Sequence, residues 1–495
     1  MEQFSNFLIP ILDLKLLSLV AIGTFAGIYI GAIPGLSVTM ATALLLSLTY
    51  TWDTLAALAL IMGIYVGGVY GGSRSAMLLN IPGAPSSIAT TFDGYPLALK
   101  GEAGYGIGLA TIMSAVGGLI GVLFLAFTTP FISQIAIKVS HIDYFLLGVM
   151  GLLLIGSLSK GDFTKSLFTA FFGVNIGLIG LDAITGIPIL TFGSLELTTG
   201  INVVVAILGL FGFSEVLIQL TKSFRADPIK QVGKIIPKLS VLLKLLPLSL
   251  RVSVIGVLTG ALPGVGGEIA ALLGYDHAKR TVKKPSRKFG EGAYEGVVAP
   301  EAANNAAIGG ALIPMLTLGI PGDAVTAVII GALVIHGLNP GPMLMVNTPE
   351  LFWVITGALL MANLFLLIFG LTGIRMFQKI VSVHKGILYP AITLITIIGA
   401  YSINNSVTDV YWMAFFGLLG FVFRIHQFPI APFVLGMILG PLISKSFRGG
   451  MMAAGDDPLV FLKTFVTSPI SVILTLFIIL SVVLSLRNKN KMIVQ

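Results

Sequence analysis

The stretch Gly31-Ala-Ile-Pro34-Gly35-Leu36 recurs in the second half of the chain as Gly260-Ala-Leu-Pro263-Gly264-Val265. Both copies lie inside apolar sequence that otherwise predicts membrane helix. A Pro-Gly pair removes a backbone donor and weakens a helix. Lipid offers no water to the freed backbone groups, so such a break survives only where protein or a wet cavity surrounds it. Matched breaks in the two halves of a membrane chain indicate the binding site of a secondary transporter.

The composition of the 495 residues is that of a polytopic membrane protein. Hydrophobic residues make up 56% of the chain and charged residues only 10%, whereas a soluble domain carries about 25% charged residues. At about 20 apolar residues for each span, the chain holds roughly ten to fourteen membrane-spanning or re-entrant segments. The absence of cysteine excludes disulfides, thiolate metal sites and cysteine nucleophiles. The five histidines show no metal-ligand spacing and no phosphate-binding loop of the ATPase type occurs, so we expect no cofactor.

More than half of the basic residues fall in three clusters, at 222–251, 279–288 and 487–491, which the positive-inside rule places in the cytoplasm. The segment 181–199 has acidic residues and no lysine or arginine, so it is expected outside. The C-terminus is then cytoplasmic. The basic clusters lack the aromatic platforms of a nucleic-acid site, so we expect lipid and not nucleic acid around the chain.

Two pairs of breaks relate the halves of the chain. Pro34-Gly35 and Pro263-Gly264 are 229 positions apart, and Pro82-Gly83 and Pro321-Gly322 are 239 positions apart. The first copy ends inside at Lys100, and the second ends outside near 339–350, so the pattern predicts two repeats of inverted topology. We expect an all-α polytopic membrane protein with Pro-Gly-broken helices that meet near the middle of the bilayer. The expected regions are a first membrane repeat (1–221), a basic cytoplasmic linker (222–250), a second membrane repeat (251–443) and a C-terminal loop, last transmembrane helix and basic tail (444–495).

A set of short strings covers the chain up to about residue 440. They are Gly31 to Leu36, Tyr70-Gly-Gly-Ser73, Asn80-Ile-Pro-Gly83, Asp93-Gly-Tyr-Pro96, Phe289-Gly290, Glu295-Gly296, Ala299-Pro-Glu-Ala-Ala-Asn-Asn-Ala306, Leu318-Gly-Ile-Pro-Gly322 and Gly337-Leu-Asn-Pro-Gly-Pro342. Together they resemble the large membrane subunit, the permease, of tripartite tricarboxylate transporters. The string from Ala299 to Ala306 is the specific one, whereas a bare Pro-Gly pair is not.

The resemblance implies an uptake system in the cell (inner) membrane of a bacterium or archaeon. In such a system a periplasmic solute-binding protein delivers a carboxylate, and a small membrane subunit joins the permease. The resemblance also implies symport with sodium or protons and no use of ATP. Arg74 departs from the family pattern, in which a small or apolar residue is expected.

A carboxylate substrate needs donors without a large fixed charge, and helix N-termini supply free N–H groups and about half a positive charge. Arg74 could pair with a substrate carboxylate bidentately, or with an acid such as Asp93. The candidate substrate-binding residues are Pro34, Gly35, Ser37, Thr39, Ser86, Ser87, Pro263, Gly264, Gly266, Gly267, Thr326 and Arg74. The alternative is that glycine and serine only allow close packing of helices here.

Amide and backbone carbonyl oxygens suit sodium, and an acid inside apolar sequence is a functional candidate by default. The candidate ion-coupling residues are Asn80, Glu301, Asn304, Asn305 and Asp323. Glu301 would carry the proton in a proton symporter, or orient the two asparagines in a sodium symporter. The alternative is that the amides only satisfy broken helix ends.

The sequence therefore predicts a secondary transporter subunit that imports a tricarboxylate or related organic anion by an elevator-like movement. A carboxylate channel and a membrane-embedded enzyme are the alternatives. The enzyme would need a paired nucleophile and base or a metal cluster, and the sequence shows neither.

Overall fold

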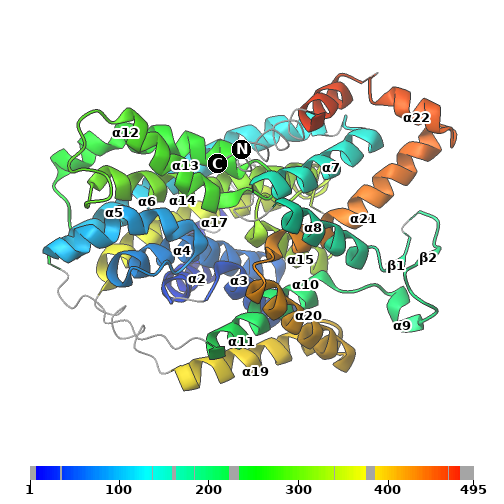
Figure 1. Cartoon of the computed structure of the whole chain (residues 1–495), viewed down its shortest axis with the longest axis horizontal. Helices are drawn as coiled ribbons and strands as arrows, with labels where there is room; N and C mark the ends of the chain where they lie inside the picture. Colours follow the sequence, from blue (N-terminus) through cyan, green and yellow to red (C-terminus); the bar gives the residue numbers. More distant parts are fainter. Residues whose placement is uncertain are drawn as a thin grey trace.

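The computed structural model describes residues 7–9, 11–33, 36–136, 138–158, 163–182, 184–221, 233–338, 340–374, 385–466 and 468–479. Within these residues the chain is almost wholly helical (Figure 1). Two short strands, β1 (Gly180–Leu181) and β2 (Pro188–Ile189), pair antiparallel with Gly180 opposite Ile189. The predicted all-α class is confirmed.

The helices of the first half are α2 (Leu14–Ala32), α3 (Val38–Thr49), α4 (Thr54–Leu79), η1 (Pro85–Ser87), α5 (Ile88–Leu97), η2 (Ala98–Glu102), α6 (Ala103–Ala136), α7 (His141–Leu158), α8 (Phe163–Gly177), α9 (Leu195–Thr198), α10 (Val203–Ile207), η3 (Leu208–Phe213) and α11 (Ser214–Thr221). The helices of the second half are α12 (Leu239–Gly260), α13 (Gly266–Thr281), α14 (Tyr294–Leu318), α15 (Ala324–Ile335), α16 (Leu344–Asn347), α17 (Pro349–Thr372), α19 (Lys385–Asn404), α20 (Val407–Ile425), α21 (Ile430–Ala453) and α22 (Pro458–Thr464).

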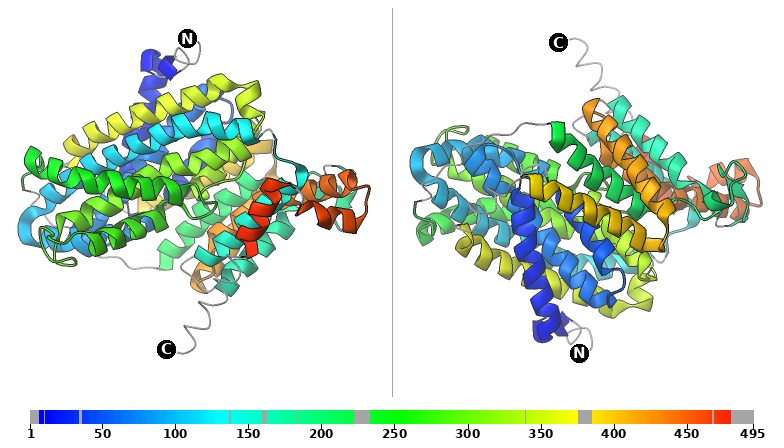
Figure 2. Two further views of the ribbon diagram at one scale, coloured as in Figure 1. Left: turned by 90° about the horizontal axis from the view of Figure 1, so that it is seen from above. Right: turned by 90° about the horizontal axis from the view of Figure 1, so that it is seen from below.

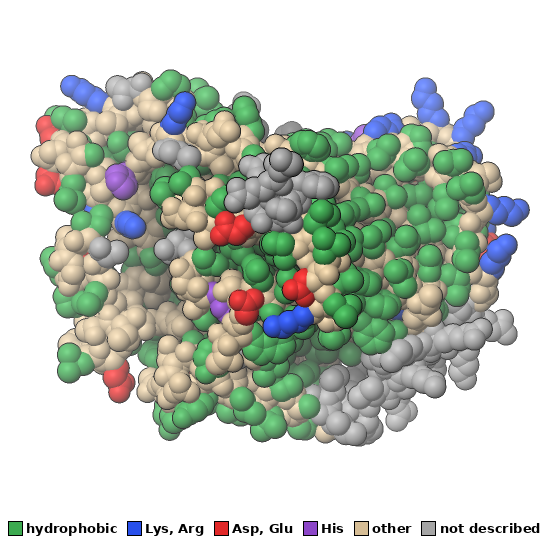
Figure 3. All heavy atoms as spheres, turned by 180° about the vertical axis from the view of Figure 1, so that it is seen from behind, with side chains coloured by type: hydrophobic (Ala, Val, Ile, Leu, Met, Phe, Trp, Pro, Cys, Tyr) green, Lys and Arg blue, Asp and Glu red, His purple; other side chains and the backbone are tan. Residues whose placement is uncertain are grey.

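Eight helical segments among the described residues are long and apolar enough to cross a membrane, and three shorter apolar helices accompany them. The outer surface fits this setting, because hydrophobic side chains cover most of one broad face and lysine and arginine lie mostly toward its edges (Figure 3). The chain is therefore a multi-pass membrane protein. Together the eight long and three shorter apolar helices of the described residues make eleven segments, within the ten to fourteen that the sequence predicts.

Each of the four breaks joins a long helix to a short one: α2 to α3, α4 to η1 and α5, α12 to α13, and α14 to α15. The sequence explains where the long helices stop. Asn80 (φ 56°) and Gly319 (φ 70°), which are 239 positions apart, end α4 and α14 in the left-handed conformation that Asn and Gly tolerate. Side-chain caps start two of the short helices: Ser37 accepts a hydrogen bond from the Met40 N–H, and Asp323 caps α15.

The packing of the long helices repeats with the same spacing as the sequence. A Cβ atom on Gly31 would lie 2.2 Å from the carbonyl oxygen of Gly68, and one on Gly260 would lie 2.3 Å from that of Ala307. The first members of these pairs are 229 positions apart, and the second members are 239 apart. Only glycine allows backbones to approach this closely. The two halves therefore place α2 on α4, and α12 on α14, in the same way.

The contact registers also give the directions of the long helices. The contacting pairs are Gly23 with Leu60 and Gly31 with Gly68, Gly256 with Ala303 and Gly260 with Ala307, Gly117 with Ala302 and Gly121 with Ala306, and Gly118 with Asn363 and Gly370 with Thr111. Rising numbers on both helices show that α2 runs parallel to α4, α12 to α14, and α6 to α14. Falling numbers on one helix show that α6 runs antiparallel to α17. Figure 2 shows α17, α6, α14 and α12 lying as a layer of long helices.

Two expected boundaries fall inside helices. α12 begins at Leu239, so residues 239–250 of the expected linker are helical, and α21 continues from Ile430 to Ala453 across position 443. The basic residues at 222–232 and 487–491 lie outside the described residues.

Candidate functional site

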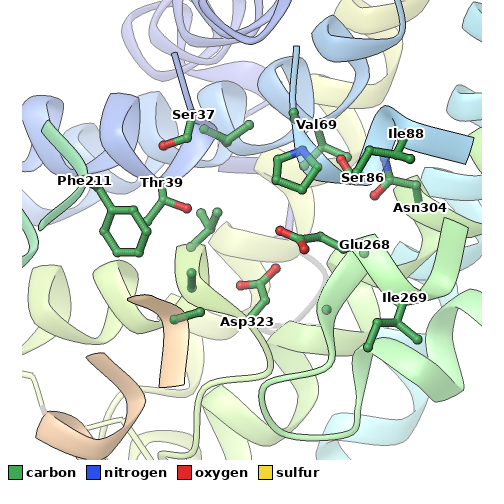
Figure 4. Close-up of a pocket in the computed structure, with 18 of the residues that line it drawn as sticks. Ser37, Thr39, Val69, Ser86, Ile88, Phe211, Glu268, Ile269, Asn304 and Asp323 are labelled. Carbon is green, nitrogen blue, oxygen red and sulfur yellow. The ribbon is translucent and has the colours of Figure 1, made fainter. Parts of the chain in front are cut away.

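The elements that follow all four breaks meet around one cavity of about 490 Å³. Figure 4 shows side chains from α3, η1, α13 and the start of α15 facing it. The residues that line it are Ser37, Val38, Thr39, Tyr65, Val69, Pro82, Gly83, Ala84, Pro85, Ser86, Ile88, Phe211, Glu215, Gly264, Val265, Gly266, Gly267, Glu268, Ile269, Asn304, Ile308, Asp323, Ala324, Val325, Arg424, Ala431 and Pro432.

The first half of the chain contributes hydroxyl groups and helix starts to the cavity. Ser37 and Thr39 lie at the start of α3, and Ser86 lies in η1. Tyr65 and Val69 come from the middle of α4. This side therefore presents neutral hydrogen-bonding groups and the positive end of α3.

The second half contributes acids and an amide. Glu268 lies in the first turn of α13, Asn304 projects from α14, and Asp323 is the N-cap of α15. The Asp323 carboxylate accepts a hydrogen bond from the Thr326 N–H (2.7 Å) on Oδ1 and one from the Tyr65 hydroxyl (2.5 Å) on Oδ2. In Figure 4 the Glu268 and Asp323 carboxylates point into the cavity and toward one another.

The residues that line the cavity come from matching positions of the two halves. At the spacing of 229, Ser37 matches Gly266 and Thr39 matches Glu268; at the spacing of 239, Tyr65 matches Asn304, Val69 matches Ile308 and Ala84 matches Asp323. Both halves thus contribute lining residues from matching positions, but the side chains at those positions differ in their chemistry. Both acids of these matched positions belong to the second half.

Helices outside the two sets of breaks complete the wall. Glu215 of α11 and Arg424 of α20 line the cavity and form an ion pair with each other. The lining as a whole contains three carboxylates, Glu215, Glu268 and Asp323, and one guanidinium, Arg424. The lining therefore carries more negative than positive charge.

Asn304 is the buried polar side chain of the cavity that lacks protein partners. It is 1% exposed, and neither Oδ1 nor Nδ2 has a hydrogen-bond partner in the described structure. A Cβ atom on Gly267 would lie 2.2 Å from Oδ1 of Asn304, so glycine makes room for the amide beside the start of α13. Buried amide groups normally have partners, so this one is available to a ligand.

Several other sequence-predicted residues are not among those that line the cavity. Ser87 and Thr326 are fully buried; the Ser87 hydroxyl has no partner in the described structure, and Thr326 bonds Asp323. Pro263 lies at the break before α13. Asn80 is exposed and serves as the C-cap of α4. Pro34 and Gly35 lie outside the described residues.

Glu301 forms a separate buried site one turn of α14 before Asn304. Its carboxylate accepts hydrogen bonds from the hydroxyls of Thr90 (2.5 Å) and Ser114 (3.0 Å), so it joins α5, α6 and α14. Asn305 donates its amide to the backbone carbonyl of Glu301 (3.0 Å), while its Oδ1 has no partner in the described structure. Neither residue lines the cavity.

Arg74 lies away from the cavity and is fully buried in α4. Its guanidinium donates hydrogen bonds to the backbone carbonyls of Phe369 (3.1 Å) and Gly370 (2.8 Å) near the end of α17. The guanidinium also lies over the aromatic rings of Tyr29 and Tyr70. The side chain therefore holds α4 against α17.

The expected alternative of an Arg74 pair with Asp93 is wrong, because Asp93 has other partners. One carboxylate oxygen of Asp93 accepts three backbone N–H groups, from Gly290, Gly292 and Ala293, and the other accepts the Tyr275 hydroxyl (3.0 Å). Asp93 thus fixes the loop before α14 to α5. An acid whose oxygens are filled in this way needs no arginine.

The described residues contain no group of three or more histidine, cysteine, aspartate or glutamate side chains arranged to hold a metal ion.

Residues 17–435 match the model of the tripartite tricarboxylate transporter TctA family. The chain belongs to this family. It is 36% identical over 470 residues to an uncharacterized 52.8 kDa protein in the TAR-I ttuC' 3' region of Agrobacterium vitis, which covers 95% of this chain and 93% of that protein. It is 41% identical over 240 residues to an uncharacterized protein in the TAR-II ttuC' 3' region of the same organism, covering 48% of this chain and 97% of that protein. No solved structure matches the chain.

As a TctA family member, the chain is a subunit of a tripartite tricarboxylate transporter and not an enzyme. The resemblance drawn from its short strings is confirmed over most of the chain. The family name states a three-part assembly, so the cavity belongs to one component of a larger transporter.

Besides most of the aliphatic lining, sequence reasoning missed four larger residues that line the cavity of this TctA protein, namely Tyr65, Phe211, Glu215 and Arg424. A signal existed for three of them. Tyr65 matches Asn304 at the spacing of 239, and Glu215 and Arg424 are an acid and a base inside apolar segments. Phe211 carries no such signal, because one phenylalanine in an apolar helix resembles any other.

Proposed function

We propose that this TctA subunit imports a tricarboxylate or related organic anion together with a cation, sodium or a proton, and that the cavity is the transport site. The observation that carries the proposal is the convergence of all four broken elements on one cavity whose lining has three carboxylates and one guanidinium. A periplasmic solute-binding protein delivers the anion, and a small membrane subunit completes the transporter in the bacterial or archaeal inner membrane.

The first-half side of the cavity suits the carboxylate. The start of α3 offers backbone N–H groups and the positive end of the helix dipole, and Ser37, Thr39 and Ser86 offer hydroxyl donors. Arg424 adds a guanidinium that can exchange Glu215 for a substrate carboxylate, since the pair already lies at the cavity wall. These groups bind an anion without holding it too tightly for release.

The negative lining explains why a cation accompanies the anion. Two like unit charges about 6 Å apart repel by roughly 3 kcal/mol at an effective dielectric constant of about 20. A di- or tricarboxylate that enters a cavity with three carboxylates experiences several such repulsions. A bound cation cancels them, so occupancy by the anion and by the cation is coupled.

The helix directions support the inverted-topology repeat that this mechanism uses. α2 and α4 run opposite to α12 and α14, because α6 is parallel to α14 and antiparallel to α17, whereas α17 is parallel to α2 through the Phe25–Phe369 and Tyr29–Gly373 contacts. Two copies of one packing unit that run in opposite directions are the basis of alternating access in many transporters.

Contacts between loops support the proposed orientation, with the C-terminus in the cytoplasm. Lys100 donates to the Glu291 carbonyl (2.6 Å), and Arg287 pairs with Glu102 (2.5 Å), joining segments that the positive-inside rule puts in the cytoplasm. On the other side, Arg448 pairs with Asp182 (3.0 Å) in the segment expected outside. Each contact joins segments assigned to the same side.

The test is uptake by the chain reconstituted with its small subunit and solute-binding protein in proteoliposomes. Labelled carboxylates are screened with an inward sodium gradient, with a pH gradient, and with neither. The proposal predicts saturable uptake of one carboxylate that a cation gradient drives. Uptake that responds to neither gradient contradicts symport.

A carboxylate channel is distinguished in the same vesicles by counterflow. A carrier exchanges external labelled substrate for internal unlabelled substrate and accumulates the label transiently, whereas a channel does not. Absence of counterflow together with uptake that does not saturate would overturn the carrier mechanism.

A further inference from the structure

We propose that the second-half side of the cavity is the site of the coupling cation, a sodium ion held by the carboxylates of Asp323 and Glu268 and the side-chain oxygen of Asn304. This assignment rests on the proposed cation-coupled import and names the side chains that perform the coupling. It places the cation among α13, α14 and the start of α15, and it leaves the start of α3, η1 and Arg424 to the carboxylate groups of the substrate.

Asn304 is the independent indication of a ligand. Its amide is 1% exposed, lines the cavity and has no hydrogen-bond partner on either Oδ1 or Nδ2 in the described structure. A buried amide that has no hydrogen-bond partner destabilises the folded protein. A cation on Oδ1 removes that cost for the oxygen, while Nδ2 remains free to donate to a carboxylate oxygen of the substrate. A single amide can therefore contact both ligands.

Asp323 is held in position to bind a cation. As the N-cap of α15 it forms a capping box with Thr326, and the Tyr65 hydroxyl fixes its Oδ2 atom at 2.5 Å. An ionised carboxylate has about four acceptor positions, so Oδ2 keeps one position beyond the bond from Tyr65. The negative charge of Asp323 thus lies at the cavity with an oxygen still able to act as a ligand.

Glu268 brings the second carboxylate. It lies in the first turn of α13, lines the cavity and points toward Asp323 (Figure 4). Carboxylate and amide oxygens are hard ligands, and hard cations prefer them. Two carboxylates and one neutral oxygen give a donor set for a small hard cation such as sodium, and a dehydrated sodium ion needs several such oxygens.

The first half of the chain has no second copy of this site. The positions that match Glu268, Asn304 and Asp323 are Thr39, Tyr65 and Ala84. None of the three carries a carboxylate, although all three line the cavity. At these matched positions only the second half of the chain supplies the proposed cation ligands. We therefore place the cation beside α13, α14 and the start of α15.

Sodium binding to the purified complex of this chain with its small subunit tests the site without transport. Binding of radioactive sodium is measured in a choline chloride background for the wild type, Asp323→Asn, Glu268→Gln, Asn304→Ala and the control Glu350→Gln. Glu350 is an exposed acid at the start of α17 outside the cavity. We expect each cavity variant to weaken sodium binding about tenfold or more and the control to bind as the wild type does.

The melting temperature of each variant is measured first, so that a loss of binding is read only from folded protein. Wild-type-like sodium binding by Asp323→Asn and Glu268→Gln overturns the site but leaves cation-driven import standing, because the uptake assay measures that import separately. Sodium binding that is absent in the wild type, while a pH gradient drives uptake, also overturns the site. Uptake that responds to no cation gradient removes the proposed function itself.

Discussion

Ser37 shows how one residue can serve both the helix and the ligand. Its side chain accepts the Met40 N–H (3.0 Å) at the start of α3 and also lines the cavity. Aspartate is as good an N-cap as serine, but it places a negative charge on the side of the cavity that we assign to the carboxylate. Substitutions at this position therefore separate folding from binding.

For Ser37→Ala we expect a loss of about 1 kcal/mol of stability from the missing cap. For Ser37→Asp we expect wild-type stability but an apparent KM for the carboxylate raised about tenfold or more, from repulsion of roughly 1.4 kcal/mol. Thermal unfolding and initial uptake rates measure the two effects. An Asp variant with an unchanged KM would show that the substrate does not approach α3.

Arg74 belongs to the folding of the protein and not to the cavity. Arg74→Gln removes two charged hydrogen bonds to the Phe369 and Gly370 carbonyls, each worth about 1.5–3 kcal/mol. We expect a lower melting temperature and an unchanged apparent KM in the fraction that folds. A selective rise in KM with normal stability would instead support the substrate role that the sequence alone suggested.

At the scale of elements, the breaks are built on backbone contacts that only glycine allows. Gly260→Ala would place a Cβ atom 2.3 Å from the Ala307 carbonyl oxygen, so α12 and α14 must separate. We expect about 1–3 kcal/mol of destabilisation and reduced uptake. In the control Gly151→Ala on α7, the nearest atom lies 3.2 Å away on the Leu439 side chain, which can move. Equal stability of the two variants, measured by thermal unfolding, contradicts this view of the break.

Asp182 attaches the hairpin of β1 and β2 to α21 through its ion pair with Arg448. Hydrogen bonds from the backbone and side chain of Thr185, the Ile184 N–H and the nearby Arg448 lower the pKa of Asp182 below its ordinary value, although partial burial opposes them. A lowered pKa means that the stabilisation is present above the unfolded pKa of about 3.9 and is lost as the pH falls through the folded value.

We therefore expect Asp182→Asn to melt at a lower temperature than the wild type at neutral pH. The difference should begin to shrink below about pH 4, where the unfolded chain binds a proton at Asp182, and should vanish only when the pH falls below the lowered pKa of the folded state. Melting curves of both proteins across this range measure the effect. A difference in melting temperature that does not change with pH would show that the stabilisation comes from packing and not from the charge of Asp182.

The sequence predicted the element pattern well because its signals are local. Pro-Gly pairs stop helices wherever they stand, so Pro82-Gly83, Pro263-Gly264 and Pro321-Gly322 fall between a long and a short helix as expected. Chain contacts at long range were not predictable in this way. The carbonyl that accepts a hydrogen bond from Arg74 and the N–H groups that donate to Asp93 belong to segments about 200 to 300 positions away.

At the scale of the whole molecule, the spacing of 229 and 239 between the halves predicted that the breaks belong together. The structure adds that Tyr65 and Asn304, and Ala84 and Asp323, line one cavity as matched positions. Sequence reasoning placed Glu301 with the ion ligands; in the structure its carboxylate accepts hydrogen bonds from Thr90 and Ser114 and does not line the cavity. It missed the wall of α11 and α20, because a charged residue inside an apolar segment indicates a functional site but does not show which cavity the residue lines.

The absence of cysteine from the chain allows a direct test of the claim that this cavity is the transport site. Ser86→Cys places one thiol in η1 at the cavity, and Thr199→Cys places one at an exposed position after α9, in the segment that we propose to lie outside, as a control. The measurement is the rate at which a charged, thiol-specific reagent modifies each variant in proteoliposomes, with and without the transported carboxylate and sodium. We predict that modification of Ser86→Cys abolishes uptake, and that the carboxylate together with sodium slows this modification. Thr199→Cys should be modified at the same rate with and without substrate and should keep its uptake. Modification of Ser86→Cys that leaves uptake intact, at a rate that substrate does not change, would contradict the account.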